Sequence, residues 1–535
     1  MLLSNPAPHA RRSRPGWAQR SIILTGVVAL PLLGLPSGGS LWAAPHSATD
    51  VHEFSTVHRT AASRADCGPG SLPETGLQGD VPAADRENGR SKQGYRCNLS
   101  LVGSYATRGG GITSTTFEHC SYTGSLFPGA LVSDDPGVQV IDAADPARPR
   151  RTATLAEPAM RAGTWESLKV NTARKLLAGT AVPVAHGTGY LSIYDISDCA
   201  HPRLLNPGPG TDLAMPLGIT THEGGFSPDG RTYWSASPIN GNFNAVDVSD
   251  PTQPRVVWEG NNGGRGAHGF GISRDGNRLY LSTGGGVTVY DISAVQRHDP
   301  NPVVHQVSRI SWQDGTNTQH SVPVDYNGTP YLFTVDESSS GGVKLIDLTE
   351  ETAPQVVNTI KLEINLPQHL DSGYASSMGG SVFAYEAHYC AADRATNPTA
   401  LACGWISSGV RVFDVRDPFH IREIAYFNPP AQTARNTDLF NSPHALISVI
   451  GTPALSQPAI DRAKRDGDWT EAEAQGPRAD LTAFGDLSTD WCFSPPEWHG
   501  TQLWTTCADN GFLVLQLDNG VYTPPADQAG TIGQS

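Results

Sequence analysis

The sequence predicts an all-β fold: a seven-bladed β-propeller closed by an N-terminal strand, with a partly helical insertion before the last blade. Three observations predict it. An alternating strand motif recurs along the chain, an isolated strand precedes its first copy, and the last copy has no further strand behind it. Copies spaced 44–67 residues apart are typical of propeller or solenoid arrays. The 535 residues fit one such domain, because each blade buries its faces against its neighbours.

Six segments carry the motif, an alternating β-branched strand that ends in Asp and usually runs into a polar, Pro-containing turn. The motif residues are Asp142, Asp195, Asp247, Asp291, Asp347 and Asp414. One copy reads VQVIDAADPARPR and ends at Arg150, and the last of the six reads VRVFDVRDPFHIR. A seventh copy, GFLVLQL, has Gln516 in place of the Asp. Asp-Gly turns within 226–234 and 272–281 predict the first two strands of blades three and four.

These segments resemble the LVIVD-repeat family of β-propellers, and the resemblance covers roughly residues 98–520. It implies a propeller fold and a location outside the cytoplasm. It implies no common catalytic activity.

The two ends of the predicted propeller complement each other. No apolar strand pattern follows the seventh copy, whereas residues 98–104 look like a strand without a blade. A propeller removes its exposed edges when one terminus supplies the missing strand of the other terminus's blade. We therefore expect 98–104 to complete the blade of 490–518, the alternative being an independent N-terminal strand. Outside 98–520 we expect a flexible arm at 49–97 and a tail at 521–535, and within it an insertion at 431–488.

Residues 1–48 have the pattern of a signal peptide: several Arg residues, an apolar run at 21–35, and small residues behind it. The alternative is a membrane anchor, but the run is interrupted by Pro31 and is short for a spanning helix. We expect a periplasmic or secreted protein with no transmembrane anchor in its mature form. Arg11 and Arg12 leave both Sec and twin-arginine export open.

Eight cysteines in an exported chain favour disulfides. Cys390 with Cys403, and Cys492 with Cys507, each bracket one predicted hairpin, so we expect these two pairs. Pairing Cys67 with Cys97 and Cys120 with Cys199 would complete the set, but spacing does not fix connectivity. Cysteine ligation of a metal is the alternative for Cys390 and Cys492, although no zinc-type C-x-x-C spacing occurs.

One polar residue, mostly His, precedes each motif position by 23–29 residues. These residues are His119, Glu166, His222, His268, His320, His388 and Asp490. The first strand of every blade lines the central channel, so equivalent positions form a ring around the axis. Imidazole and carboxylate are common ligands of transition metals, which predicts an axial site for an ion such as copper or zinc. The competing interpretation is a repeated structural His that holds water and inter-blade hydrogen bonds. Glu223 is expected to point away from His222, because neighbouring strand residues face opposite sides.

The formal net charge of −15 argues against a phosphate-binding surface, so we expect no nucleic-acid partner. Nucleophile-elbow, P-loop and H-E-x-x-H motifs do not occur in the sequence. We therefore predict a scaffold that binds an unknown protein or small-molecule ligand and carries a His-rich axial site. The alternative is a copper-type oxidoreductase that uses the same His ring.

Overall fold

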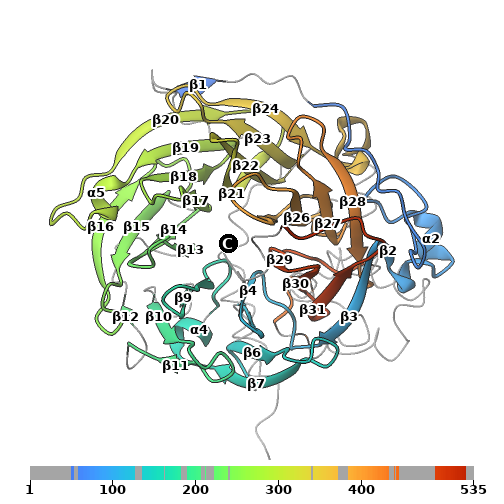
Figure 1. Ribbon diagram of the computed structural model, residues 1–535, viewed down its shortest axis with the longest axis horizontal. Coiled ribbons are helices and arrows are strands. Elements are labelled where there is room, and N and C mark those ends of the chain that lie inside the picture. Colours follow the sequence, from blue (N-terminus) through green and yellow to red (C-terminus); the bar gives the residue numbers. More distant parts are fainter. Residues whose placement is uncertain are drawn as a thin grey trace, which may run out of the picture. The chain divides into compact units, whose positions relative to one another are not determined.

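The computed structural model describes residues 50–52, 58–126, 135–161, 163–181, 190–206, 211–212, 222–238, 241–338, 341–370, 383–432, 439, 441–444 and 489–525. Within these residues the chain forms seven sheets, each one blade of a ring, and the four main strands of every blade are antiparallel. The strands β4, β13, β17, β21 and β29 lie nearest the centre, and β7, β16, β20 and β24 lie at the rim (Figure 1). The predicted seven-bladed β-propeller is confirmed.

The blades follow one another along the chain. Blade 1 contains β4 (Ser114–Phe117), β5 (Cys120–Thr123), β6 (Val138–Asp142) and β7 (Arg150–Leu155). Blade 2 contains β8 (Lys169–Asn171), β9 (Leu176–Thr180), β10 (Tyr190–Asp195) and β11 (Arg203–Leu204), with β12 (Thr211–Asp212) also paired to β10. Blade 3 contains β13 (Glu223–Phe226), β14 (Thr232–Ala236), β15 (Asn242–Asp247) and β16 (Arg255–Asn261). Blade 4 contains β17 (Phe270–Ile272), β18 (Arg278–Thr283), β19 (Gly286–Asp291) and β20 (His305–Ser311), and β1 (Asp50–His52) adds a parallel edge strand to β20.

Blade 5 contains β21 (Thr316–Tyr326), β22 (Thr329–Ser338), β23 (Gly342–Asp347) and β24 (Gln355–Ile360). Blade 6 contains β25 (Tyr389–Ala392), β26 (Ala400–Gly404), β27 (Val410–Asp414) and β28 (Arg422–Asn428). Blade 7 contains β29 (Glu497–His499), β30 (Gln502–Cys507), β31 (Gly511–Leu517) and β3 (Leu99–Tyr105). The short helices are α2 (Ala83–Glu87), α4 (Pro158–Arg161), α5 (Ser293–Gln296), η1 (Ser91–Gln93), η3 (Glu363–Asn365) and η4 (Pro367–His369).

The motif strand is the third strand of every blade, and its Asp caps the turn that follows. All six motif Asp residues accept a hydrogen bond from the backbone N–H two residues further on. Four of them also pair with an Arg that begins the fourth strand, as Asp247 does with Arg255 at 3.0 Å. The repeat therefore encodes turn geometry rather than a chemical site.

Strand β3 completes blade 7, as the sequence predicted. It pairs antiparallel with β31 from Leu99 opposite Leu517 to Tyr105 opposite Phe512 (Figure 1). The strand also fits closely against blade 1, because a Cβ at Gly103 would lie 2.2 Å from the carbonyl oxygen of Pro146. The first and last parts of the propeller thus share one sheet.

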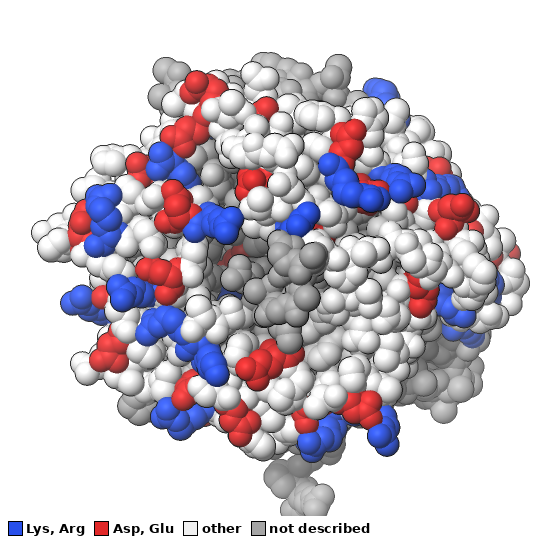
Figure 2. Space-filling model, in the orientation of Figure 1, with Lys and Arg blue, Asp and Glu red and all other residues white. Residues whose placement is uncertain are grey.

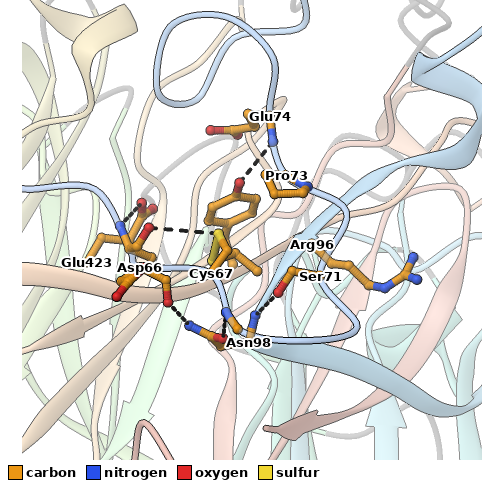
Figure 3. Close-up of a disulfide and its surroundings, with 12 residues drawn as sticks. Asp66, Cys67, Ser71, Pro73, Glu74, Arg96, Asn98 and Glu423 are labelled. Atoms are coloured by element: carbon orange, nitrogen blue, oxygen red, sulfur yellow. Dashed lines mark hydrogen bonds between the residues drawn. A yellow bond between two sulfur atoms is a disulfide. The ribbon is translucent and has the colours of Figure 1, made fainter. Parts of the chain in front are cut away.

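The segment predicted as a flexible arm is packed against the propeller from residue 58 onward, so that prediction is wrong for residues 58–97. Strand β2 (Tyr95–Cys97) extends blade 6 by pairing with β28. Val81 and Tyr95 are buried in the same core as blades 5 and 6. Around the Cys67–Cys97 disulfide, Asn98 donates to the carbonyl of Asp66, and Glu74 donates its N–H to the Tyr426 hydroxyl (Figure 3). The prediction failed because the apolar residues of this segment that pack against the propeller are scattered along a Gly-rich stretch without strand periodicity.

All eight cysteines form disulfides. The bonds are Cys67–Cys97, Cys120–Cys199, Cys390–Cys403 and Cys492–Cys507. Cys390 and Cys403 lie directly opposite each other in β25 and β26. The two pairings expected from the sequence are confirmed, the two open ones are settled, and cysteine ligation of a metal is excluded.

Residues 1–48 and most of the insertion at 431–488 lie outside the described residues. At the other end Tyr522 is buried, and its ring packs against Trp498 at 4.7 Å. The helices in the described ranges include none long and apolar enough to cross a membrane. Lys and Arg are interspersed with Asp and Glu over the face shown in Figure 2.

Candidate metal centre

Three side chains from three consecutive blades meet at one carboxylate oxygen. The Oε2 atom of Glu166 lies 3.1 Å from Nε2 of His222 and 3.7 Å from Nε2 of His268. The two imidazole nitrogens are themselves 3.1 Å apart. Glu166 and His268 are 2% and 5% exposed, so their polar atoms are shielded from bulk water.

A second group uses the other oxygen of the same carboxylate. Nε2 of His388, in blade 6, lies 3.3 Å from Oε1 of Glu166 and 3.1 Å from Oε2 of Glu337, in blade 5. Glu337 also lies 3.7 Å from Nδ1 of His268, which links the two groups. All members of both groups except His222 are fully buried.

The backbone positions these residues in the same way in blades 3, 4 and 6. His222 and His388 stand directly before the first strand of their blade, and His268 stands two residues before it. The backbone N–H of each His donates to a carbonyl oxygen of the second strand: His222 to Ala236, His268 to Ser282 and His388 to Gly404. Glu166 precedes β8, and its N–H donates to the carbonyl of His222 in the neighbouring blade. The segments that lead into these first strands therefore bring four of the seven residues chosen by the offset, Glu166, His222, His268 and His388, to one place.

A third carboxylate borders the two groups. Oε1 of Glu223 lies 2.9 Å from Nδ1 of His320, and its Oε2 accepts a 2.6 Å hydrogen bond from the Tyr389 hydroxyl. That hydroxyl is also 3.5 Å from Oε2 of Glu166. A Cβ at Gly269 would lie 1.8 Å from the Glu223 carboxylate, so only glycine leaves room for it there.

Burial and charge act against each other in this cluster. Burial opposes the ionisation of Glu166, but the charges and hydrogen bonds of His222 and His388 hold its pKa well below the ordinary value. Burial likewise disfavours a charged His388, yet hydrogen bonds to Glu166 and Glu337 raise its pKa to about 10. Burial lowers the pKa of His268. The cluster thus contains ionised carboxylates that hold positive charge next to them.

Two predicted ring members lie elsewhere. His119 stands in the turn between β4 and β5, its side chain 46% exposed, with Nε2 3.8 Å from Oδ1 of Asp142. Asp490 belongs to a different buried group with His444 and Asp509 and accepts backbone N–H bonds from Asp509 and Asn510. The prediction that either residue lies on the ring was wrong. The number of residues between a ring position and the motif Asp includes the loops of the blade, so it changes with the lengths of those loops.

Three members of the cluster were not predicted. Glu223 was expected to point away from His222, but β13 begins only at Glu223, so strand alternation does not separate the two. Glu337 lies at the end of the ten-residue strand β22, which reaches the axis from the second position of its blade. Tyr389 follows His388 directly. The offset rule detects one residue per blade and therefore missed these neighbours.

The residues fit a metal ion. With bonds of about 2.0–2.1 Å in a tetrahedron, ligand atoms stand about 3.3 Å apart. The measured separations, 3.1 and 3.7 Å in the first group and 3.1 and 3.3 Å in the second, all lie close to that value. Nδ1 of His268 has no hydrogen-bond partner among the described residues. Imidazole and carboxylate donors suit zinc, manganese, iron or copper(II).

Comparison with known proteins gives neither a family nor an activity. No family model matches the chain, and no curated protein matches it. A solved Lactobacillus plantarum protein is 14% identical, with a TM-score of 0.42, over 58% of this chain and 82% of that one. A putative 6-phosphogluconolactonase from Bacteroides fragilis is 10% identical, with a TM-score of 0.40, over 59% and 82%. The periplasmic gluconolactonase of Pseudomonas aeruginosa is 14% identical, with a TM-score of 0.35, over 46% and 67%.

Proposed function

We propose that the protein is an exported β-propeller of the LVIVD-repeat type that binds a divalent transition-metal ion on its axis. The ion is held by Glu166, His222 and His268. The observation that supports this most strongly is that three buried or nearly buried donor atoms from separate blades already stand at the spacing of a coordination shell. The two imidazole nitrogens come from separate blades, and both face one oxygen of a carboxylate from a third blade.

Three protein ligands leave at least one coordination position open. An open position lets the ion bind a small molecule through an oxygen or nitrogen donor, which makes ligand binding the function of the site. The Tyr389 hydroxyl, which donates its hydrogen to Glu223 and lies 3.5 Å from Oε2 of Glu166, is placed to accept a hydrogen bond from such a molecule. The four disulfides support a location in an oxidising compartment outside the cytoplasm.

Replacing the shared carboxylate should remove the metal. We expect the wild-type protein, purified without a His tag, to retain at least one transition-metal ion per chain by elemental analysis. Glu166→Gln should weaken Zn²⁺ binding by about 100-fold or more, because it removes the charged ligand that both groups share. His119→Ala is the matched control: it removes a predicted ring residue that the structure places on an exposed turn, and metal content should not change. Metal-free wild-type protein that also fails to bind added Zn²⁺ would refute the proposal.

Metal affinity should continue to rise with pH above neutrality. Burial tends to lower the pKa of His222, but the charge of Glu166 outweighs it and raises the pKa above the ordinary 6.5. An imidazole must lose its proton before it binds an ion, so affinity falls as pH drops through this raised pKa. Isothermal titration with Zn²⁺ at pH 6, 7 and 8 should show tighter binding at each step. A plateau above pH 6 would show that His222 is not a ligand.

A further inference from the structure

We propose that the axial cluster holds two divalent ions, bridged by the carboxylate of Glu166. This inference rests on the proposed function and extends it from one ion to a pair. The first ion lies between Glu166, His222 and His268, and the second lies between Glu166, His388 and Glu337.

The two oxygens of Glu166 face different ligand sets. Its Oε2 faces the imidazoles of His222 and His268, at 3.1 and 3.7 Å, and its Oε1 faces His388 at 3.3 Å. A carboxylate that offers one oxygen to each of two ions is the usual bridge of a two-metal site, where the ions stand about 3.5–4 Å apart. The division of ligands between the two oxygens is the arrangement such a bridge requires.

The orientation of His388 suits a ligand of the second ion. Its Nδ1 lies 3.0 Å from the carbonyl oxygen of Phe493, which can only accept, so Nδ1 carries a proton and donates. This fixes the ring and leaves Nε2 between two carboxylate oxygens, at 3.1 and 3.3 Å. Two carboxylate oxygens facing one nitrogen call for a positive charge there, which is a proton on Nε2 in the ion-free protein and the metal ion when one is bound. A His that donates its other ring N–H to a backbone carbonyl is the common support of a metal ligand.

The carboxylate count also favours a pair of ions. Glu166, Glu223 and Glu337 are 2%, 1% and 5% exposed and lie within one network of contacts. Three buried carboxylates are costly without matching positive charge. Protonated imidazoles supply part of this charge in the ion-free protein. Once the imidazoles are neutral ligands, one divalent ion leaves an excess negative charge, whereas two ions exceed the three charges by one. Such a pair attracts a bridging hydroxide or an oxyanion, so the ligand class is an oxygen donor that spans both ions.

The experiment counts ions in the full mature chain. Chelator-stripped wild-type protein is reloaded with Zn²⁺ and measured by native mass spectrometry and elemental analysis, and Mn²⁺-loaded protein is examined by electron paramagnetic resonance. We expect two Zn²⁺ per chain and exchange-coupled Mn²⁺ signals. Glu337→Gln should bind one Zn²⁺ and lose the coupling. Glu497→Gln is the matched control: it changes a carboxyl that is equally buried, 5% exposed, but contacts Thr116 instead of the cluster. It should still bind two.

Each of the remaining outcomes contradicts the two-ion proposal, and the outcomes can be told apart. One Zn²⁺ in the wild type leaves the proposed function intact but refutes the second ion. Two Zn²⁺ in both wild type and Glu337→Gln, without coupling, would place the second ion elsewhere, for example at His444, Asp490 and Asp509. No bound Zn²⁺ refutes both proposals. Thermal unfolding of each variant by circular dichroism verifies that the propeller is folded before ions are counted.

Discussion

A chain that begins at residue 106, and therefore lacks β3, should aggregate instead of folding to a soluble monomer. Without β3, blade 7 retains three strands, and the backbone donors and acceptors of β31 face solvent over seven residues. An open, apolar edge of this kind pairs with other chains. Leu513 and Leu515, now buried, belong to the apolar core that the closed blade protects. Size-exclusion chromatography should find no monomer peak.

Two longer chains isolate the effect of this strand. A chain that begins at residue 58 keeps residues 58–97 and, among the described strands, loses only β1, a three-residue edge strand on β20, so it should remain a soluble monomer. A chain that begins at residue 98 loses both Cys67 and Cys97, so no unpaired thiol arises, and it keeps β3. We expect it to fold with a lower thermal midpoint. Equal solubility of the chains beginning at residues 98 and 106 would show that β3 does not close the ring.

Arg411→Ala should destabilise the protein by about 3–5 kcal/mol, because it leaves two buried carboxylates without a counter-charge. The Arg411 guanidinium is fully buried, pairs with Glu423 at 3.0 Å and with Glu74, and lies over the ring of Tyr426. Burial raises the pKa of Glu74, and the charge of Arg411 opposes that rise. In the variant the pKa of Glu74 is free to rise further, so stability should recover partly as pH falls and that carboxyl takes up a proton.

The comparison variant is Arg255→Ala. This Arg pairs with Asp247 at a similar distance, 3.0 Å, but its side chain is 75% exposed. Exposed pairs contribute at most about 1 kcal/mol, so its urea midpoint should scarcely move. The triple variant Glu74→Gln, Glu423→Gln, Arg411→Met removes all the buried charges and should regain most of the loss. If Arg411→Ala and Arg255→Ala shift the midpoint equally, burial does not govern the Arg411 contribution.

The fold was predictable because its signals are local and repeated. The motif strand, the Asp-capped turn and the hairpin between Phe226 and Tyr233 each depend on a few adjacent residues, and six copies reinforce one another. Closure followed from a missing strand at one end and an extra strand at the other. The packing of residues 58–97 was not predictable, because contacts such as that of Glu74 with Arg411 join residues more than 300 positions apart.

The candidate site was predictable only to the extent that the blades repeat. Glu166, His222, His268, His320 and His388 come from the first-strand region of successive blades, so a constant offset found them together. His119 and Asp490 satisfy the same offset but come from blades 1 and 7, where the intervening loops differ. Glu337 approaches from a second strand, and its position depends on the length of the β21–β22 hairpin, which no periodic pattern encodes.

The pairing of β3 with β31 also sets the order of events during synthesis. Residues that lie side by side in blade 7 are more than 400 positions apart, so β3 waits for β31, the last strand to be made. Until then six blades and an incomplete seventh exist as an open array with edges at both ends. Contacts of such long sequence separation form late and slowly. The ring therefore closes only after residue 517 has been made, and chaperones that shield strand edges should associate with the protein until that moment.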